Sequence, residues 1–420
     1  MKLTLNNIGK IKSASIDIEG ITVIGGENNT GKSTISKALY SILNAIFDLN
    51  NTINNYRIYS LNKRFERFWL DNQKNYLFYF INKKPFEKDI LEHLSSKVSF
   101  DEFKKYLNSN DFFIKISKEI KISDKELKEL YLPFTISNEE LITKLINKSI
   151  SSEFGSQVCN INKSDASIEL KLSRKIIRVQ LEKNEVKKTS IKNNILSHIN
   201  VVYFDNSIMV EQIFSDFYNY NEHSIESHYK KMWYLLNEKV SEDIIGEIIA
   251  DNELKEILDI VNGVCPGKII KNNNREFQYL SENNVTFSME NISAGLKTFA
   301  IIKTLLIKGA LKKSDVLILD EPEIHLHPKW QIIFAKLIVL LNKKFDLKIL
   351  INTHSPYFLE ALDVNIAKYG LKSNKYKYYL SSIDNDGNAF FKDVSDSIDK
   401  IYALLAEPLQ ELENEKFSQN

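Results

Sequence analysis

The chain of 420 residues contains only two cysteines, Cys159 and Cys265, and has almost no net charge. Two cysteines so far apart exclude a disulfide framework and a cysteine-based metal site, so we expect buried, inert thiols in a reducing compartment. A formal net charge of +1 provides no global field that would draw the protein onto nucleic acid or an acidic membrane. Any such contact therefore requires a local patch of basic residues.

Long apolar runs are also absent from the sequence. The N-terminal segment MKLTLNNIGKIKSAS lacks the apolar centre of a signal peptide, and no run of about 18 or more apolar residues occurs. We therefore expect a cytoplasmic protein with no membrane partner. The length predicts two or three domains, and contents of 43% hydrophobic and 26% charged residues are typical of a soluble globular protein.

The segment GGENNTGKST, residues 25–34, contains the pattern G-x-x-x-x-G-K-[ST] of a phosphate-binding loop, or P-loop. A predicted strand at 21–24 precedes it, and apolar residues at helical spacing follow it. Backbone N–H groups from Asn28 to Lys32 would lie at a helix N-terminus, which favours phosphate. We expect Lys32 to reach the β- and γ-phosphates and Ser33 to coordinate Mg²⁺.

Two later strands are predicted to end in polar residues. VLILDEP ends in Asp320 and Glu321, two carboxylates that are costly at the end of an apolar strand unless something binds them. We expect Asp320 to share Mg²⁺ with Ser33, and Glu321 to orient or deprotonate a water molecule. LKILINTHSP ends in His354, whose neutral imidazole would touch the γ-phosphate. A polar turn and a structural histidine are the alternatives.

The segment NISAGLKTFAIIKTLL predicts a helix that begins after Ser293. Capping is one role for this serine, and a second anion site formed with the Gly295 backbone is another. Near the C-terminus, Asp384 and Asp386 flank Asn385 in a pattern typical of a hairpin turn rather than of a metal site. His325 and His327 have no third ligand nearby, so we do not predict zinc there.

Four sequence motifs together carry a family resemblance. GENNTGKS, ISAGLK, LILDEPEIHLHP and INTHSP occur in the order found in the ABC-type ATPase superfamily, which the chain resembles closely over about 1–48 and 265–365. EPEIHLHP and THSP are similar to the branch that contains overcoming-lysogenization-defect (OLD) nucleases and the ATPases of anti-phage systems such as Septu and PARIS. The SMC, Rad50 and RecF proteins are similar at a greater distance. Because only 34 residues follow Asp386, we expect no Toprim domain of the kind found in OLD nucleases.

The resemblance implies an α/β, ABC-ATPase-like P-loop fold with a mixed central sheet, an antiparallel β subdomain and a helical insertion. Together with the periodicity of the sequence, it divides the chain into five segments. These are an N-terminal lobe with the P-loop (1–48), a mainly helical insertion (49–165), strands that return to the core (166–207), a helical lobe (208–265) and a C-terminal part (266–420).

The resemblance also implies a composite site, in which the P-loop of one protomer holds ATP and the signature helix of a second protomer caps the γ-phosphate. The catalytic residues would then be Glu321, His354 and Lys32, with Ser33 and Asp320 on Mg²⁺. Ser293 and Gly295 would form the signature that acts in trans. The residues implied to bind the nucleotide are Gly26, Asn28, Asn29, Thr30, Gly31, Lys32, Ser33 and Thr34.

Three functions follow from these observations. The favoured one is an ATPase that forms a homodimer or higher homo-oligomer on ATP and controls a separate effector, a nuclease or toxin, in anti-phage defence. A DNA-engaging clamp of RecF or Rad50 type in DNA repair is the alternative. Its support is a basic run that is also explained as a solvated face, since Glu169, Glu182 and Glu185 are mixed in. That run consists of Lys171, Arg174, Lys175, Arg178, Lys183, Lys187 and Lys188.

A transporter subunit is the third possibility. It is disfavoured by the signature SAGLK, where transporters have Leu-Ser-Gly-Gly-Gln, and by the long helical insertion. No glutamine loop is visible after VVYFDNS, where the family places one, because this chain has Asp205, Asn206 and Ser207 there.

Overall fold

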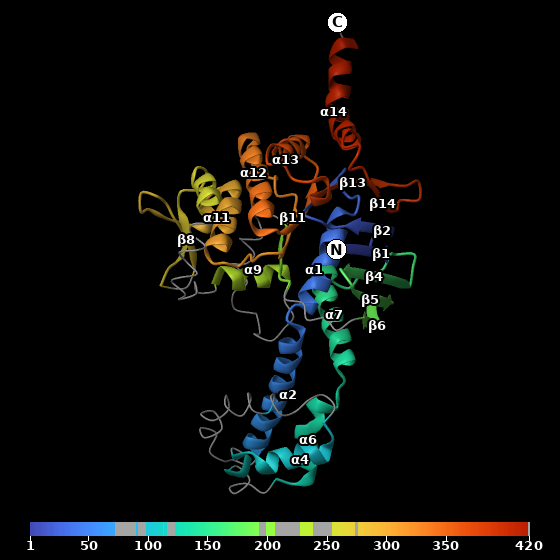
Figure 1. Cartoon of the computed structure of the whole chain (residues 1–420), viewed down its shortest axis with the longest axis vertical. Coiled ribbons are helices and arrows are strands. Elements are labelled where there is room, and N and C mark those ends of the chain that lie inside the picture. Colours follow the sequence, from blue (N-terminus) through green and yellow to red (C-terminus); the bar gives the residue numbers. More distant parts are fainter. Residues whose placement is uncertain are drawn as a thin grey trace. The chain divides into compact units, whose positions relative to one another are not determined.

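A computed structural model describes residues 1–71, 90, 98–111, 113–115, 122–192, 199–205, 227–237, 254–273 and 276–418. The chain forms two compact units, whose elements are labelled in Figure 1. The first unit contains residues 1–47, 146–194 and 198–420, and the second contains residues 48–145 and 195–197. The five-segment division made from the sequence stays a prediction.

An 11-stranded sheet, counted over the described residues, forms the centre of the first unit. Its strands in chain order are β1 (Lys2–Ile8), β2 (Ile11–Asp17), β3 (Ile21–Gly25), β4 (Asp165–Leu172), β5 (Lys175–Glu182), β6 (Glu185–Lys192), β7 (Val201–Phe204), β11 (Val316–Asp320), β12 (Lys348–Thr353), β13 (Tyr376–Ile383) and β14 (Ala389–Asp393). In space the order is β6-β5-β4-β1-β2-β14-β13-β3-β12-β11-β7.

The sheet is mixed, as predicted. Strands β13, β3, β12, β11 and β7 run parallel to one another, whereas β6, β5, β4, β1 and β2 pair antiparallel. Between these two groups, β14 pairs antiparallel with β13 and parallel with β2. Every residue of β3, β7 and β11 is buried, because helices cover both faces of the parallel part. The strands predicted near 167–188 are β4, β5 and β6, and they continue this same sheet.

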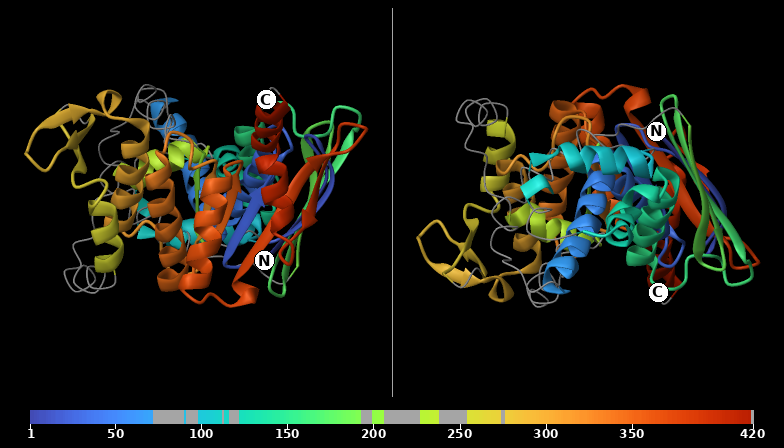
Figure 2. Two further views of the ribbon diagram at one scale, coloured as in Figure 1. Left: turned by 90° about the horizontal axis from the view of Figure 1, so that it is seen from above. Right: turned by 90° about the horizontal axis from the view of Figure 1, so that it is seen from below.

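Helix α1 (Lys32–Ile46) packs against one face of the sheet through β7, β11 and β12. The opposite face carries α11 (Ala294–Ile307), α12 (Pro328–Phe345) and α13 (Pro356–Lys368), which can be followed in Figure 2. Alternate strand residues face these two layers. Phe204, Leu319 and Ile351 therefore join the core with α11, α12 and α13, while Asn352 bonds Ser36 of α1.

A separate antiparallel sheet leads into α11. It contains β8 (Lys268–Lys271), β9 (Phe277–Leu280) and β10 (Thr286–Ser288), followed by the short helix η1 (Met289–Asn291). The preceding segment, predicted to be helical from 208, includes α9 (His228–Asn237) and a helix at 254–262. Residues 208–226 and 238–253 of that prediction lie outside the described residues.

The second unit is helical over its described residues, as predicted for the insertion. Its helices are α2 (Leu49–Asp71), α4 (Phe100–Ser109), α6 (Asp124–Thr135) and the first part of α7 (Asn138–Phe154). Ser99 and Ser123 begin α4 and α6 with capping boxes, so the first backbone N–H groups of both helices are satisfied. The chain enters this unit along α2 and leaves it along α7, whose last residues belong to the first unit.

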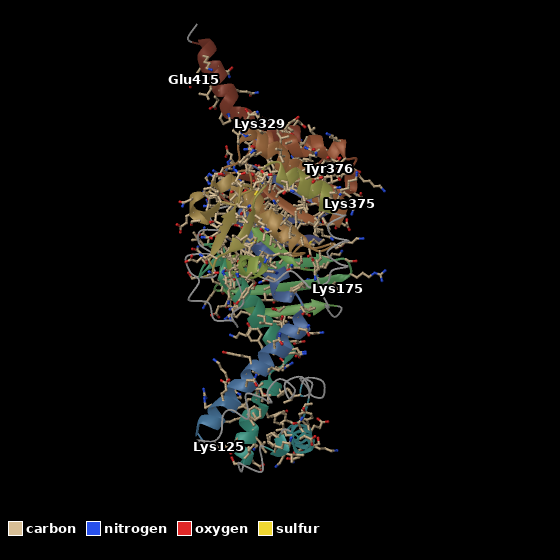
Figure 3. The ribbon with its side chains drawn as sticks, turned by 90° about the vertical axis from the view of Figure 1, so that its left-hand side faces the viewer. Lys125, Lys175, Lys329, Lys375, Tyr376 and Glu415 are labelled. Atoms are coloured by element: carbon tan, nitrogen blue, oxygen red, sulfur yellow. The ribbon has the colours of Figure 1, made fainter. Side chains whose placement is uncertain are left out.

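The C-terminal part adds a hairpin and a helix. The Asp384 carboxylate accepts hydrogen bonds from the backbone N–H groups of Asp386 (3.0 Å) and Asn388 (2.8 Å), which confirms the predicted turn between β13 and β14. Helix α14 (Asp399–Ser418) follows, and its described side chains beyond residue 406 are exposed, Glu415 among them (Figure 3). No helix in the described part of the chain is long and apolar enough to cross a membrane.

Candidate nucleotide site

Strands β3, β11 and β12 end side by side at one edge of the sheet. The register pairs Gly25 with Thr353, and Asp320 with Asn352. Since the strands are parallel, their carboxyl ends lie at the same edge, where ligands bind in open α/β sheets. The P-loop after β3, the carboxylates at the end of β11 and His354 after β12 therefore meet, as the motifs predicted.

Lys32 is held inside the P-loop. Its Nζ donates hydrogen bonds to the backbone carbonyls of Gly26 (2.9 Å) and Glu27 (2.7 Å), and the residue is only 4% exposed. Burial lowers the pKa of Lys32, while the carboxylates of Glu321 and Asp320 oppose that shift. The Nζ lies 3.9 Å from the Glu321 carboxylate, so the ammonium lies beside the end of β11.

The P-loop backbone rests on β13, which the sequence did not indicate. A Cβ atom at Gly26 would collide with the Ser381 carbonyl, so only glycine fits at this approach. The Thr30 hydroxyl donates to the Glu27 carbonyl (2.7 Å) and lies 2.8 Å from the Ser381 hydroxyl. Gly31 begins α1 with a φ of 84°, a left-handed conformation that favours glycine.

Asp320 is 4% exposed and its carboxylate is surrounded by hydrogen-bond donors. Asn352 Nδ2 donates to Oδ1 (2.7 Å), and the Tyr203 hydroxyl donates to Oδ2 (3.0 Å). Burial raises the pKa of Asp320, and hydrogen bonds from Asn352, Ser33 and Tyr203 oppose the rise. A carboxylate bonded to the Ser33 hydroxyl is a set of hard oxygen donors, which fits Mg²⁺.

Glu321 and His354 form a pair beside Lys32. The Glu321 carboxylate lies 3.3 Å from His354 Nδ1, and Glu321 itself has a φ of 50°. This close contact lowers the pKa of Glu321 and raises the pKa of His354. The raised pKa favours the protonated form of the imidazole. The neutral imidazole that touches the γ-phosphate stays a prediction.

A second glutamate, Glu323, supports the end of β12. Its Oε1 accepts hydrogen bonds from the Thr353 hydroxyl (2.5 Å) and from the backbone N–H of His354 (3.2 Å). Glu323 is 3% exposed, and burial raises the pKa of its carboxyl group. Sequence reasoning missed this residue, although it lies within LILDEPEIHLHP and its contact fixes the position of His354.

Ser293 and Gly295 lie at the N-terminus of α11. Ser293 is exposed and caps the helix, as predicted, by accepting a hydrogen bond from the backbone N–H of Leu296 (3.4 Å). Within the described part of the chain, no hydrogen bond joins Ser293 to the P-loop. Gly295 is buried, and a Cβ there would lie 3.0 Å from the His325 carbonyl and 3.2 Å from the Trp330 ring. It thus allows close packing of α11 on the segment after Glu321.

Asp205 lies at the position where the family places a glutamine loop, and it belongs to a buried ionic cluster. His228 Nδ1 lies 2.7 Å from the Glu153 carboxylate, and His228 Nε2 lies 3.2 Å from the Asp205 carboxylate. The Tyr229 hydroxyl donates to Asp205 (2.7 Å). Burial by itself would lower the pKa of His228, but the close carboxylates of Asp205 and Glu153 outweigh this effect and raise the pKa to about 9.

The charge of His228 is expected to make stability depend on pH. The folded pKa lies above the ordinary value of 6.5, so the protonated ring stabilises the fold fully below pH 6.5 and loses this effect as the pH rises through about 9. The stabilisation lost amounts to about 3 kcal/mol. The thermal midpoints of the wild type and of His228→Asn should therefore converge as the pH is raised across this window. A constant difference between the two midpoints would contradict the assignment.

Comparison with known proteins identifies the family of the chain. The chain matches the AAA ATPase domain family over residues 1–359 and belongs to that family. No curated protein matches it.

Among solved structures, the SMC head domain from Thermotoga maritima is 11% identical with a TM-score of 0.40, and the match covers 94% of this chain and 98% of that one. An SMC head bound to the C-terminal winged-helix domain of ScpA is 12% identical with a TM-score of 0.43, covering 93% and 97%. The recombination mediator protein RecF-ATPrS is 12% identical with a TM-score of 0.37, covering 94% and 97%. At such TM-scores these similarities carry no argument about function.

Proposed function

We propose that the protein is a Mg²⁺-dependent ATPase of the ABC type that acts as an ATP-gated dimerising switch. One observation carries this proposal. The Lys32 ammonium, held by P-loop carbonyls, lies 3.9 Å from the Glu321 carboxylate, which in turn lies 3.3 Å from His354. A cation at the start of α1, a carboxylate after β11 and an imidazole after β12 thus lie together at the loop whose sequence is typical of phosphate binding.

The P-loop would hold the triphosphate of ATP. Lys32 would contact the β- and γ-phosphates, and backbone N–H groups at the start of α1 would supply the remaining donors. The Ser33 hydroxyl and Asp320 would hold Mg²⁺, whose charge stabilises the negative charge that develops on the phosphoryl oxygens. The proposed nucleotide-binding residues are Gly26, Asn28, Asn29, Thr30, Gly31, Lys32, Ser33 and Thr34.

Glu321 is the proposed general base. Its pKa is lowered by the close contact with His354, so it is ionised at neutral pH and can accept a proton from an attacking water molecule. His354 would hold this carboxylate in place and contact the γ-phosphate. Glu323 keeps His354 at the end of β12 through the backbone N–H hydrogen bond. The orientation of the Glu321 carboxylate would therefore also depend on Glu323.

Ser293 and Gly295 would complete the site of a second copy. The exposed Ser293 hydroxyl stands at the N-terminus of α11, where the helix dipole favours a phosphate. Because Gly295 packs against the His325 carbonyl, the position of α11 is linked to the segment that follows Glu321 in the same chain. A homodimer, or a higher homo-oligomer, is the assembly that follows from this arrangement.

The composite site can be tested by mixing inactive variants. Ser293→Arg should block the signature, and Lys32→Met should block the P-loop, so each protein alone should hydrolyse no ATP. An equal mixture should recover about a quarter of wild-type activity, because half of the dimers are mixed and each of those has one intact site. Phosphate release measures the outcome.

A second mixture is the control. Lys32→Met and Glu321→Gln alter the same half of the site, so their mixture should stay inactive. If the Ser293→Arg and Lys32→Met mixture also stays inactive, although both proteins are folded and Ser293→Arg binds ATP, the composite site is wrong.

We further propose that the ATP-bound assembly controls a separate effector, a nuclease or toxin of an anti-phage system. Support comes from the resemblance of EPEIHLHP and THSP to the ATPases of Septu and PARIS. The test is co-expression of Glu321→Gln with the proteins encoded beside it, followed by co-purification with and without Mg²⁺-ATP. A partner should be retained with Mg²⁺-ATP, and it should be lost when Lys32→Met replaces Glu321→Gln. Absence of any retained neighbour would contradict this part of the proposal.

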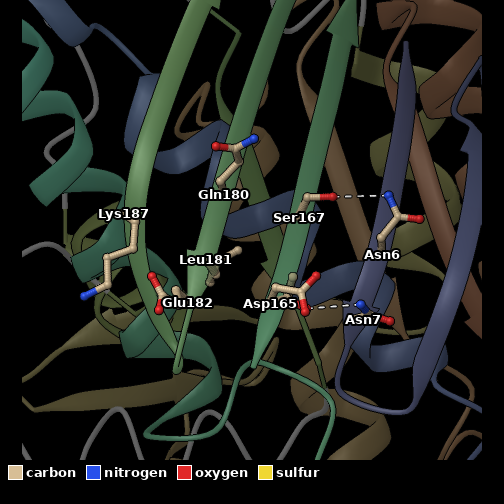
Figure 4. A pocket seen from close by; sticks show the side chains of 9 residues that line it. Asn6, Asn7, Asp165, Ser167, Gln180, Leu181, Glu182 and Lys187 are labelled. Carbon is tan, nitrogen blue, oxygen red and sulfur yellow. Dashed lines mark hydrogen bonds between the residues drawn. The ribbon is translucent and has the colours of Figure 1, made fainter. Parts of the chain in front are cut away.

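A DNA clamp is the weaker candidate, because charges of both signs occupy the basic strands. Arg178 pairs with Glu169, and Lys187 lies 3.0 Å from Glu185. A depression of about 450 Å³ on this face is lined by Asp165 and Glu182 as well as Lys187 (Figure 4). DNA binding that weakens steeply with added salt would favour the clamp, because counterion release has that signature.

A further inference from the structure

Tyr203 connects Asp320 to the buried ionic cluster. Strand β7 pairs with β11 so that Tyr203 is opposite Ile318, and the Tyr203 hydroxyl reaches the Asp320 carboxylate at 3.0 Å. The Tyr203 ring lies over the His228 ring, with centroids 4.3 Å apart and planes inclined by 31°. Tyr203 therefore contacts two groups. Its hydroxyl contacts the carboxylate proposed to hold Mg²⁺, and its ring contacts the charged imidazole of His228.

His228 connects Tyr203 to helix α7. Its Nδ1 is 2.7 Å from the Glu153 carboxylate, and its backbone N–H donates to the other Glu153 oxygen at 3.0 Å. Glu153 lies in the last turn of α7, the helix by which the chain returns from the second unit. Tyr203, His228 and Glu153 are all buried, so none of them can shift without moving its neighbour.

We propose that Tyr203 and His228 are positioning residues that couple the Asp320 carboxylate to the last turn of α7 through Glu153. The coupling rests on the proposed function, because it requires that Asp320 respond to Mg²⁺-ATP. When Asp320 turns toward a bound cation, the Tyr203 hydroxyl follows its acceptor and the packed rings carry the shift to Glu153. A buried pair held by good hydrogen bonds has few alternative positions, so the shift is transmitted rather than absorbed.

Hydrogen–deuterium exchange of α7 tests the coupling. In the wild type, Mg²⁺-ATP should slow exchange of the amides at 149–154 by about fivefold or more, the lower range of a typical coupling between two sites. Tyr203→Phe keeps the ring but removes the hydroxyl, so this response should disappear. The Mg²⁺ concentration needed for half-maximal hydrolysis should also rise by about tenfold or more, because Asp320 loses a donor that orients it.

The matched control is Tyr378→Phe. Tyr378 is also buried, and its hydroxyl lies 3.1 Å from the Asp363 carboxylate, away from the P-loop. This variant removes the same kind of hydrogen bond, so it separates coupling from general loss of stability. It should leave both the exchange response and the Mg²⁺ requirement unchanged.

Glu153→Gln tests the other end of the connection. It should abolish the exchange response by itself, and adding it to Tyr203→Phe should produce no further change in that response, because both act on one path. If Tyr203→Phe and Tyr378→Phe give the same exchange response and Mg²⁺ requirement as the wild type, the inference is wrong while the ATPase proposal stands. A wild-type protein that binds no Mg²⁺-ATP in calorimetry overturns both.

Discussion

Replacing Glu321 by glutamine is expected to lower ATP turnover by about two orders of magnitude or more, while ATP binding is retained. Glutamine keeps the shape of the side chain but cannot accept the proton of the attacking water. The close contact with His354 that lowers the pKa of Glu321 also depends on the negative charge of the carboxylate. The measurements are initial rates of phosphate release and calorimetric titration with Mg²⁺-ATP. Glu407→Gln, a change on an exposed part of α14, is the control and should leave both unchanged.

The same variant should trap an ATP-bound assembly. Light scattering should show a rise from 48.7 kDa to twice that mass or more when Mg²⁺-ATP is added. An assembly that is already formed without nucleotide would mean that ATP rearranges existing oligomers and does not cause protomers to associate. A monomer under both conditions would mean that the second half of the site comes from another protein, or that Ser293 and Gly295 have a different role. Unchanged turnover in Glu321→Gln would exclude its role as the base.

Replacing Lys32 by methionine is expected to weaken Mg²⁺-ATP binding by about 100-fold or more, because truncation of one partner in a desolvated charge contact costs several kcal/mol. The wild-type ammonium is fixed by the Gly26 and Glu27 carbonyls before any ligand arrives, so little ordering is left for binding. Without it, the Asp320 and Glu321 carboxylates would repel the incoming triphosphate. Calorimetry or competition with a fluorescent ATP analogue measures the loss.

Lys303→Met is the matched control for this substitution. Lys303 is also buried, and its Nζ donates to the carbonyls of Cys265 (2.9 Å), Pro266 (3.1 Å) and Gly267 (2.7 Å). Its removal should lower thermal stability without a comparable loss of affinity for ATP. Equal losses of affinity in the two variants would show that Lys32 contributes to stability rather than to recognition.

The sequence predicted the local part of the site and the residue types at its centre. A P-loop is specified by neighbouring residues, and apolar runs that end in Asp320 or His354 identify strand ends without any knowledge of the fold. Parallel pairing then brings those ends together, as expected for an α/β sheet. The capping role of Ser293 was predictable for the same reason, because a cap depends only on the next three residues.

The supporting contacts could not be predicted, because they join segments that are far apart in the chain. The hydrogen bond between Thr30 and Ser381 spans 351 positions, and the one between Tyr203 and Asp320 spans 117. Tyr203 and Asn352 do leave a weak signal, since each is a polar residue within an otherwise apolar strand. His228 leaves none, and its high pKa follows only from the two carboxylates that the fold places beside it.

The position of β13 also matters while the protein is being made. Strand β3 pairs with β12 on one side and with β13 on the other, and Ser381 of β13 supports Gly26 and Thr30. During synthesis, the P-loop strand therefore has an open edge until residues 376–383 have left the ribosome. A nascent chain that already contains the P-loop, the carboxylates and His354 still lacks the strand that holds the loop in shape. The growing polypeptide thus completes the proposed nucleotide cradle only after the residues that precede β13 have been synthesised and have had time to fold.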